Sequence, residues 1–171
     1  MSRTPPLRGR GLRLEPLATS HAAEMEHVLA DAGLYEYIGG SPPSRAELDA
    51  RYARQVAGPR GDAFAWHTWV VRLADDGCAV GQVQATVHGD DGVAELAWTI
   101  GAPWQGRGLA SDAAALVVEF VVASGVGRVI AHIHPEHLAS QRVAARLGLV
   151  PTGRTVDGEV EWEARHGIRG R

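Results

Sequence analysis

The most constraining feature of the sequence is a strand, a glycine-rich turn, a helix and a second strand in direct succession. Residues Val93–Ile100 have the apolar and β-branched composition of a strand, and an apolar stretch over residues 108–124 predicts a helix. Residues 129–134 predict another strand. Because two strands joined by a crossover helix lie parallel in the same sheet, this segment predicts one parallel strand pair.

Antiparallel strands are predicted on both sides of this unit. Further strands are expected over residues 12–15, 66–73, 79–88, 152–156 and 159–164, and further helices over residues 21–30, 45–57 and 137–147. The sequence therefore predicts an α+β fold, with a mostly antiparallel sheet of about seven strands, one parallel pair and about four helices. With 171 residues and no internal repeat or linker, we expect a single domain over residues 1–171.

Charge and composition exclude several classes of function. A net charge of −3 provides no basic field for nucleic acid. No apolar run approaches the roughly 20 residues that cross a bilayer, and prolines and arginines stand where a secretory signal needs apolar residues. Cys78 is the only cysteine, so an intrachain disulfide is impossible. We expect a cytoplasmic protein with neither nucleic-acid nor membrane partners, and the sequence is compatible with a homodimer.

The turn between the first strand of this unit and its helix has the composition of a diphosphate-binding loop. Gly106 and Gly108 let the backbone approach a ligand, and Arg107 adds a cation. The first turn of the helix, with the small Ala110 and Ser111, supplies unpaired amides and the positive end of the helix dipole. Two glycines in such a turn also occur without a ligand, and neither a dinucleotide fingerprint nor a Walker loop is present.

Several segments around this loop share one pattern. They are AELAWTI at 94–100, Pro103-Trp104, the loop itself, HPEHLAS at 134–140 and RLGL at 146–149. This pattern resembles the GNAT superfamily of N-acetyltransferases and, within it, the branch that includes the ribosomal-protein N-terminal acetyltransferases. The resemblance covers nearly the whole chain. It implies a GNAT-like fold in which the two parallel strands splay apart.

The resemblance also implies that acetyl-CoA is the co-substrate and lies where the parallel strands splay. The backbone there would bind the pantetheine arm and polarise the thioester carbonyl, through Trp98, Thr99 and Ile100. The diphosphate would lie on Gln105, Gly106, Arg107, Gly108, Leu109, Ala110 and Ser111. His137 stands where the family usually has an asparagine that bonds the pantetheine, and a neutral imidazole keeps one donor and one acceptor.

Two residues match catalytic positions of the family, in which an amine attacks the thioester directly. Glu95 would be the general base, acting through water, or alternatively a strand glutamate that is exposed or paired with an arginine. Family members often use a tyrosine to protonate the leaving thiolate, but the matching residue here is Ala144. Ser140 resembles the serine proposed as this acid in the ribosomal-protein branch, and it could equally cap a helix.

Two groups of polar residues allow other interpretations. His132, His134 and His137 have a spacing that could ligate a metal, but no carboxylate or cysteine completes the set, so we expect no metal. Alternate positions of the last strand carry Glu159, Glu161 and Glu163. A solvated strand face is the favoured interpretation of these glutamates, and attraction of a cationic amine is the alternative.

The sequence thus predicts an N-acetyltransferase that transfers an acetyl group from acetyl-CoA to a primary amine. The amine would be a protein or peptide N-terminus or a small molecule. A non-catalytic acyl-CoA-binding sensor is the alternative, because the usual tyrosine acid is missing at Ala144.

Overall fold

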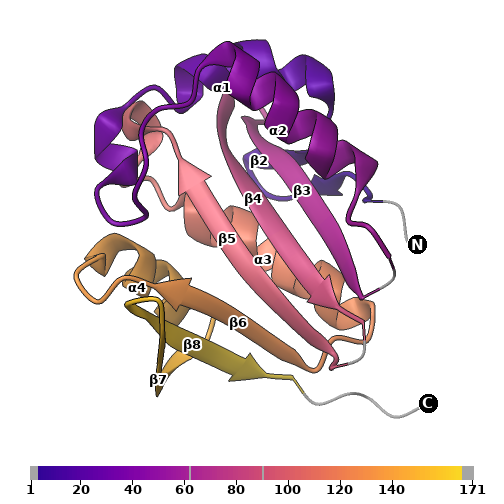
Figure 1. Cartoon of the computed structure of the whole chain (residues 1–171), viewed down its shortest axis with the longest axis vertical. Coiled ribbons are helices and arrows are strands. Elements are labelled where there is room, and N and C mark those ends of the chain that lie inside the picture. Colours follow the sequence, from indigo (N-terminus) through magenta and orange to yellow (C-terminus); the bar gives the residue numbers. More distant parts are fainter. Residues whose placement is uncertain (1–3, 62, 90, 167–171) are drawn as a thin grey trace.

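A single sheet with helices on both faces forms the protein, and the computed structural model describes residues 4–61, 63–89 and 91–166 (Figure 1). The elements in chain order are β1 (Leu7–Arg8), β2 (Leu12–Pro16), η1 (Thr19–His21), α1 (Ala22–Val28), η2 (Ala32–Tyr35), α2 (Arg45–Ala57), β3 (Phe64–Leu73), β4 (Ala79–His88), β5 (Val93–Ile100), η3 (Ala102–Trp104), α3 (Leu109–Ala123), β6 (Arg128–Ile133), α4 (Leu138–Arg146), β7 (Val150–Val156) and β8 (Glu159–Arg165).

The strand order in the sheet is β1-β2-β3-β4-β5-β6-β8-β7. The pair β5 and β6 is parallel and the other neighbouring strands are antiparallel. This confirms the predicted α+β fold with one parallel pair and four α-helices. The sheet has one strand more than expected, because the two-residue β1 is too short to show a period of its own.

Local sequence signals set the bounds of several elements. The bounds of α2, β4 and β5 agree with the expected ones. Helix α2 begins at a capping box, in which the Glu47 carboxylate accepts the backbone N–H of Ser44 at 2.7 Å and Ser44 Oγ accepts the backbone N–H of Glu47. Helix α1 is shorter than the predicted 21–30, because His21 belongs to the 3-10 turn η1 and the helix already ends at Val28.

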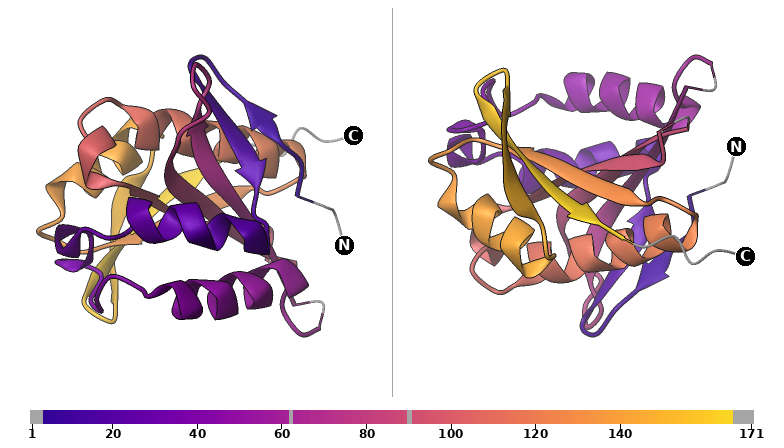
Figure 2. Two further views of the ribbon diagram at one scale, coloured as in Figure 1. Left: turned by 90° about the horizontal axis from the view of Figure 1, so that it is seen from above. Right: turned by 90° about the horizontal axis from the view of Figure 1, so that it is seen from below.

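Helices lie on both faces of the sheet (Figure 2), and a cluster of apolar side chains packs each set against it. Helices α1 and α2 pack on one face, where Met25, Leu48 and Tyr52 are buried with Val70 of β3. Helix α3 packs on the other face, against the apolar side chains of β2 to β5. On that same side, α4 packs against β6 through the buried Ala144. None of the helices in the described ranges has the length and apolar character that crossing a bilayer requires.

Strands β5 and β6 pair over only a short stretch. Val93, Ala94 and Glu95 of β5 lie opposite Arg128, Val129 and Ile130, and the register contains no later pair. Beyond Glu95 the two strands diverge toward their carboxyl ends (Figure 1). The expected splayed parallel pair is therefore present, and it opens on the side where β5 leads into α3.

Candidate functional site

The loop before α3 has the backbone geometry that an anion site needs. Gly106 and Gly108 have φ values of 74° and 79°, a region that side-chain-bearing residues rarely adopt. A Cβ atom added at either glycine would meet nothing within 4 Å, so the space above both is open. The Gln105 side chain donates to the carbonyl of Ile100 at 2.9 Å and ties the loop to the end of β5.

The first turn of α3 offers several donors at this loop. Gly108 is the N-cap residue, and the first helical bond runs from the N–H of Asp112 to its carbonyl. The amides of Leu109, Ala110 and Ser111 therefore lack intrahelical acceptors. The buried Ser111 hydroxyl has no hydrogen-bond partner within the described part of the chain. Together with the exposed Arg107, these groups fit a diphosphate.

The splayed part of β5 presents a free backbone edge beside this loop. Its residues Trp98, Thr99 and Ile100 pair with β4 on one side. On the other side the register with β6 ends at Glu95. Because backbone groups alternate between the two sides of an antiparallel strand, some of those from 96–100 point toward the open side. An extended ligand with amide groups can bind such an edge.

The diverging ends of β5 and β6 enclose an opening, the splay. Strand β5 is one wall of the splay, and the turn between β6 and α4 is the opposite wall. His137 is the N-cap residue of α4, and burial together with the nearby His134 lowers the pKa of His137, so its imidazole is neutral at pH 7. The hydroxyl of Ser140 lies 3.4 Å from Nε2 of His137. No side-chain hydrogen bond caps α4, and the Ser140 hydroxyl contacts the His137 ring, so the structure does not support the capping alternative. The role of Ser140 as an acid stays a prediction.

An aromatic side chain from the segment between α1 and α2 reaches this turn. The ring of Tyr37 stacks on His137 with centroids 4.7 Å apart, and it lies 5.4 Å from the ring of His134. Nothing in the sequence predicts the contact of Tyr37 with His137. The reason is that the two residues belong to different halves of the chain.

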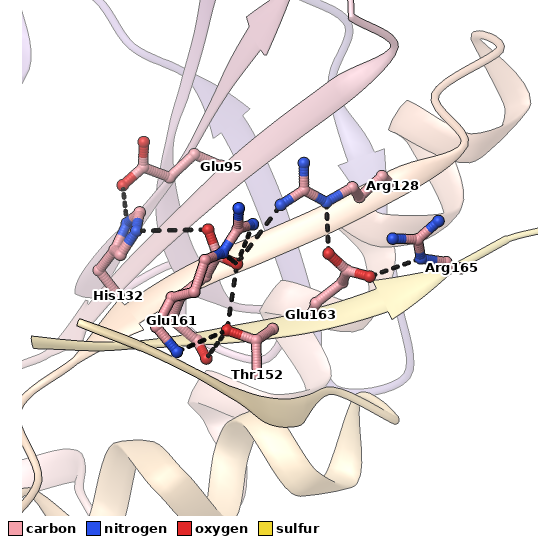
Figure 3. Close-up of polar contacts among 8 residues, drawn as sticks. Glu95, Arg128, His132, Thr152, Glu161, Glu163 and Arg165 are labelled. Carbon is pink, nitrogen blue, oxygen red and sulfur yellow. Dashed lines mark hydrogen bonds and ion pairs between the residues drawn. The ribbon is translucent and has the colours of Figure 1, made fainter. Parts of the chain in front are cut away.

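Glu95 faces His132 on the neighbouring strand (Figure 3). Its Oε1 lies 2.8 Å from Nδ1 of His132, and the Glu95 side chain keeps 40% of its surface exposed. The side-chain partner of Glu95 is therefore a histidine and not the arginine that the sequence allowed as an alternative. A carboxylate that is open to solvent and free of arginine contacts can accept a proton through water.

The glutamates of β8 are not a solvated face, which corrects the expectation from the sequence. Their side chains are only 8% exposed for Glu161 and 13% exposed for Glu163. Glu161 Oε1 accepts from Arg154 at 2.6 Å and from Thr152 at 3.2 Å. Glu163 is held by Arg128 and Arg165 (Figure 3). Sequence alternation places these glutamates on one face, but only the order of β6, β8 and β7 brings arginines to them.

The ion pairs of Glu161 predict a loss of stability in acid. Burial by itself would raise the pKa of Glu161, but hydrogen bonds from Arg154 and Thr152 and the charges of Arg154 and Arg128 lower it below the ordinary 4.5. A lowered pKa stabilises the fold above pH 4.5, and this contribution is lost as the pH falls through the folded-state value. We expect Glu161→Gln to lower the free energy of unfolding at pH 7 by about 1.5–3 kcal/mol, the range for a charged hydrogen bond.

Urea unfolding between pH 7 and pH 3 measures this effect. The difference between the wild type and Glu161→Gln should shrink at the acid end, because a protonated glutamate is also neutral. Glu159→Gln on the same strand is the control and should be nearly as stable as the wild type. A difference that stays constant with pH would contradict the assignment.

The three histidines do not form a metal site. His132 faces Glu95, whereas His134 and His137 face Tyr37. In the residues that the structure describes, no group of three or more His, Cys, Asp or Glu side chains has the arrangement to hold a metal ion.

Comparison with known proteins links this geometry to one family. The family model described as an acetyltransferase (GNAT) domain matches residues 11–150. An uncharacterized N-acetyltransferase of Bacillus subtilis, YnaD, is 29% identical over 80 residues, which are 46% of this chain and 47% of YnaD. This match thus spans about half of the curated relative.

Solved structures share the fold at low sequence identity. A candidate ribosomal-protein-serine acetyltransferase from Vibrio cholerae is 16% identical with a TM-score of 0.73, over 97% of this chain and all of that one. The microcin C7 self-immunity acetyltransferase MccE, solved with acetyl-CoA and AMP, is 14% identical with a TM-score of 0.79, over 92% and 94% of the two chains.

Proposed function

This chain belongs to the GNAT family of acetyltransferases, and from that membership we propose that it transfers the acetyl group of acetyl-CoA to a primary amine by direct aminolysis. It is an acyl-CoA-dependent enzyme, and we propose that residues 1–171 form one catalytic domain. The acceptor would be a protein or peptide N-terminus, as in the ribosomal-protein branch, or a small-molecule amine. The proposal places the enzyme in the cytoplasm and allows a homodimer.

The observation that carries the proposal is the loop before α3. Gly106 and Gly108 leave open space above a helix N-terminus, and the buried Ser111 hydroxyl lacks a partner there within the described residues. These features suit the diphosphate of acetyl-CoA. From the loop, the free edge of β5 at Trp98, Thr99 and Ile100 leads along the splay toward Glu95.

The remaining residues would act on the reacting groups. An amine nitrogen attacks the thioester carbonyl carbon, a C–N bond forms, and the C–S bond then breaks. Glu95 would take the proton of the amine through water, and a backbone N–H of β5 would stabilise the developing oxyanion. Ser140 would protonate the leaving thiolate, with His137 contacting the pantetheine arm. The buried Ala144 offers no acid, which supports Ser140.

Two measurements test the proposal. Acetyl-CoA at 100 times its dissociation constant should add about 2.7 kcal/mol to the free energy of unfolding. For a chain of this length we expect the melting temperature to rise by roughly 5–10 °C. Release of CoA should then be detected with a panel of amines that includes peptides with free N-termini, lysine side-chain mimics, polyamines and aminoglycosides.

The outcomes separate the candidate functions. A thermal shift together with CoA release in the presence of one amine class supports the transferase and identifies the acceptor. A thermal shift without CoA release from any amine would instead favour the non-catalytic acyl-CoA sensor. No thermal shift would refute the assignment of the loop.

A further inference from the structure

The carboxylates near the splay differ in their side-chain partners. Arg154 and Arg128 contact Glu161, while Arg128 and Arg165 contact Glu163. Three guanidinium groups are thus shared between two carboxylates, whose pKa values are lowered as a result. Glu95 lies outside these pairs, and in the described part of the chain the only hydrogen-bond partner of its carboxylate is His132.

His132 lies between a fixed carboxylate and an open one. His132 lies directly opposite Glu161 in the register of β6 and β8. Glu95 lies opposite Ile130, two residues before His132, so the side chains of Glu95 and His132 are on the same face of the sheet. Its Nδ1 is 2.8 Å from Oε1 of Glu95, and its Nε2 is 3.9 Å from Oε2 of Glu161. Only 17% of the His132 side chain is exposed, compared with 40% for Glu95.

Glu161 lies on the other side of the imidazole, and its carboxylate is beyond hydrogen-bond distance from Nε2 of His132. Its Oε1 accepts the bonds from Arg154 and Thr152, which leaves Oε2 directed at His132. Because an ionised carboxylate only accepts hydrogen bonds, the contact with Glu95 requires a proton on Nδ1 of His132. A side chain that hydrogen-bonds a catalytic base can orient it, as the third group of a catalytic triad does.

We propose that His132 is a positioning residue for acetyl transfer, which donates from Nδ1 to Glu95 and thereby holds that carboxylate toward the acceptor amine. This inference rests on the proposed function, because it assigns a task to the neighbour of the proposed base. Glu161 is held by Arg154 and Thr152 and takes no proton from the amine. A carboxylate held in one orientation reaches the attacking nitrogen, or its bridging water, in more encounters than a freely rotating one.

Three substitutions at His132 separate positioning from a merely structural role. His132→Ala removes the donor and should lower kcat about tenfold to hundredfold while the KM for acetyl-CoA stays unchanged. His132→Asn should recover most of kcat, because its amide nitrogen is as many bonds from Cβ as Nδ1. In His132→Gln the amide extends toward the place of Nε2, so kcat should stay low. His88→Ala, a half-buried strand histidine outside these contacts, is the control and should keep the wild-type kcat.

A double-mutant cycle with Glu95 tests whether His132 changes kcat through Glu95. If His132 acts through Glu95, His132→Ala should change kcat by less than about threefold in the Glu95→Gln background. An equal loss in both backgrounds would overturn the proposal. So would a kcat for His132→Gln as high as that for His132→Asn.

The imidazole resonances of His132 give a readout that does not need activity. Nitrogen chemical shifts in the wild type should show a protonated Nδ1, and Glu95→Gln should change them, whereas Glu159→Gln should not. Identical resonances in all three proteins would refute the contact. If the wild type releases no CoA with any amine, the proposed function fails, and the role of His132 in transfer fails with it. The resonances still decide separately whether His132 donates to Glu95.

Discussion

Replacing Gly108 with leucine is expected to weaken binding of acetyl-CoA severely, with the dissociation constant rising on the order of hundredfold, or about 2.7 kcal/mol. Gly108 has a φ of 79° and open space above it, where the diphosphate is proposed to lie. A leucine side chain would fill that space and separate the phosphates from the amides of the first turn of α3. Titration calorimetry with acetyl-CoA measures the change.

A matched glycine separates lost binding from backbone strain. Gly11, in the turn between β1 and β2, also has a φ of 79° and nothing within 4 Å of an added Cβ. A leucine at either position costs about 1–2 kcal/mol of strain, because both adopt the left-handed region. Gly11→Leu should therefore lose similar stability and still bind acetyl-CoA with wild-type affinity. Unchanged affinity in Gly108→Leu would remove the loop from the proposed site.

Replacing Glu95 with glutamine is expected to lower kcat by about 10²–10⁴-fold, the usual contribution of a general base. Glutamine keeps the size of the side chain and an oxygen for His132, but it cannot take a proton. The KM for acetyl-CoA should stay near the wild-type value, since Glu95 lies at the base of the splay and away from the loop. Steady-state kinetics with the amine found in the panel gives both constants.

The size of the kcat loss in Glu95→Gln depends on the pKa of the acceptor amine. An α-amino group has an ordinary pKa of about 7.7–8.0 and is partly neutral at pH 7, whereas a lysine amine has a pKa of about 10.4. The loss in Glu95→Gln should therefore lie at the upper end for a lysine-type acceptor and at the lower end for an N-terminus. Glu119→Gln on the exposed side of α3 is the control. A wild-type kcat in Glu95→Gln would leave the base unassigned.

Much of the fold was predictable because its signals are local. The capping box of Ser44 and Glu47 sets the start of α2, and the period of apolar residues marks β4 and β5 over their full lengths. The parallel pair follows from the order of strand, helix and strand, since the handedness of such a crossover leaves few alternatives. Strand β1 was missed because two residues carry no period.

The geometry of the loop before α3 was predictable from the sequence, whereas the side-chain contacts of the candidate site were not. The loop with Gly106 and Gly108 is one continuous segment, so its residue types show its geometry directly. The contact of His132 with Glu95 joins two strands that only the parallel register aligns. Tyr37 meets His137 through packing of the segment between α1 and α2 against the far side of the splay.

The sequence by itself determined the loop before α3, the parallel pair and the family to which both belong, because these depend on residue types within short stretches. Only the tertiary structure decided which glutamates are paired with arginines. Glu161 and Glu163 lie on β8 between β6 and β7, where Arg128 and Arg154 neutralise them, whereas Glu95 faces a histidine at the base of the splay. The protonation and exposure of a carboxylate depend on the charges around it, and those charges come from distant parts of the chain.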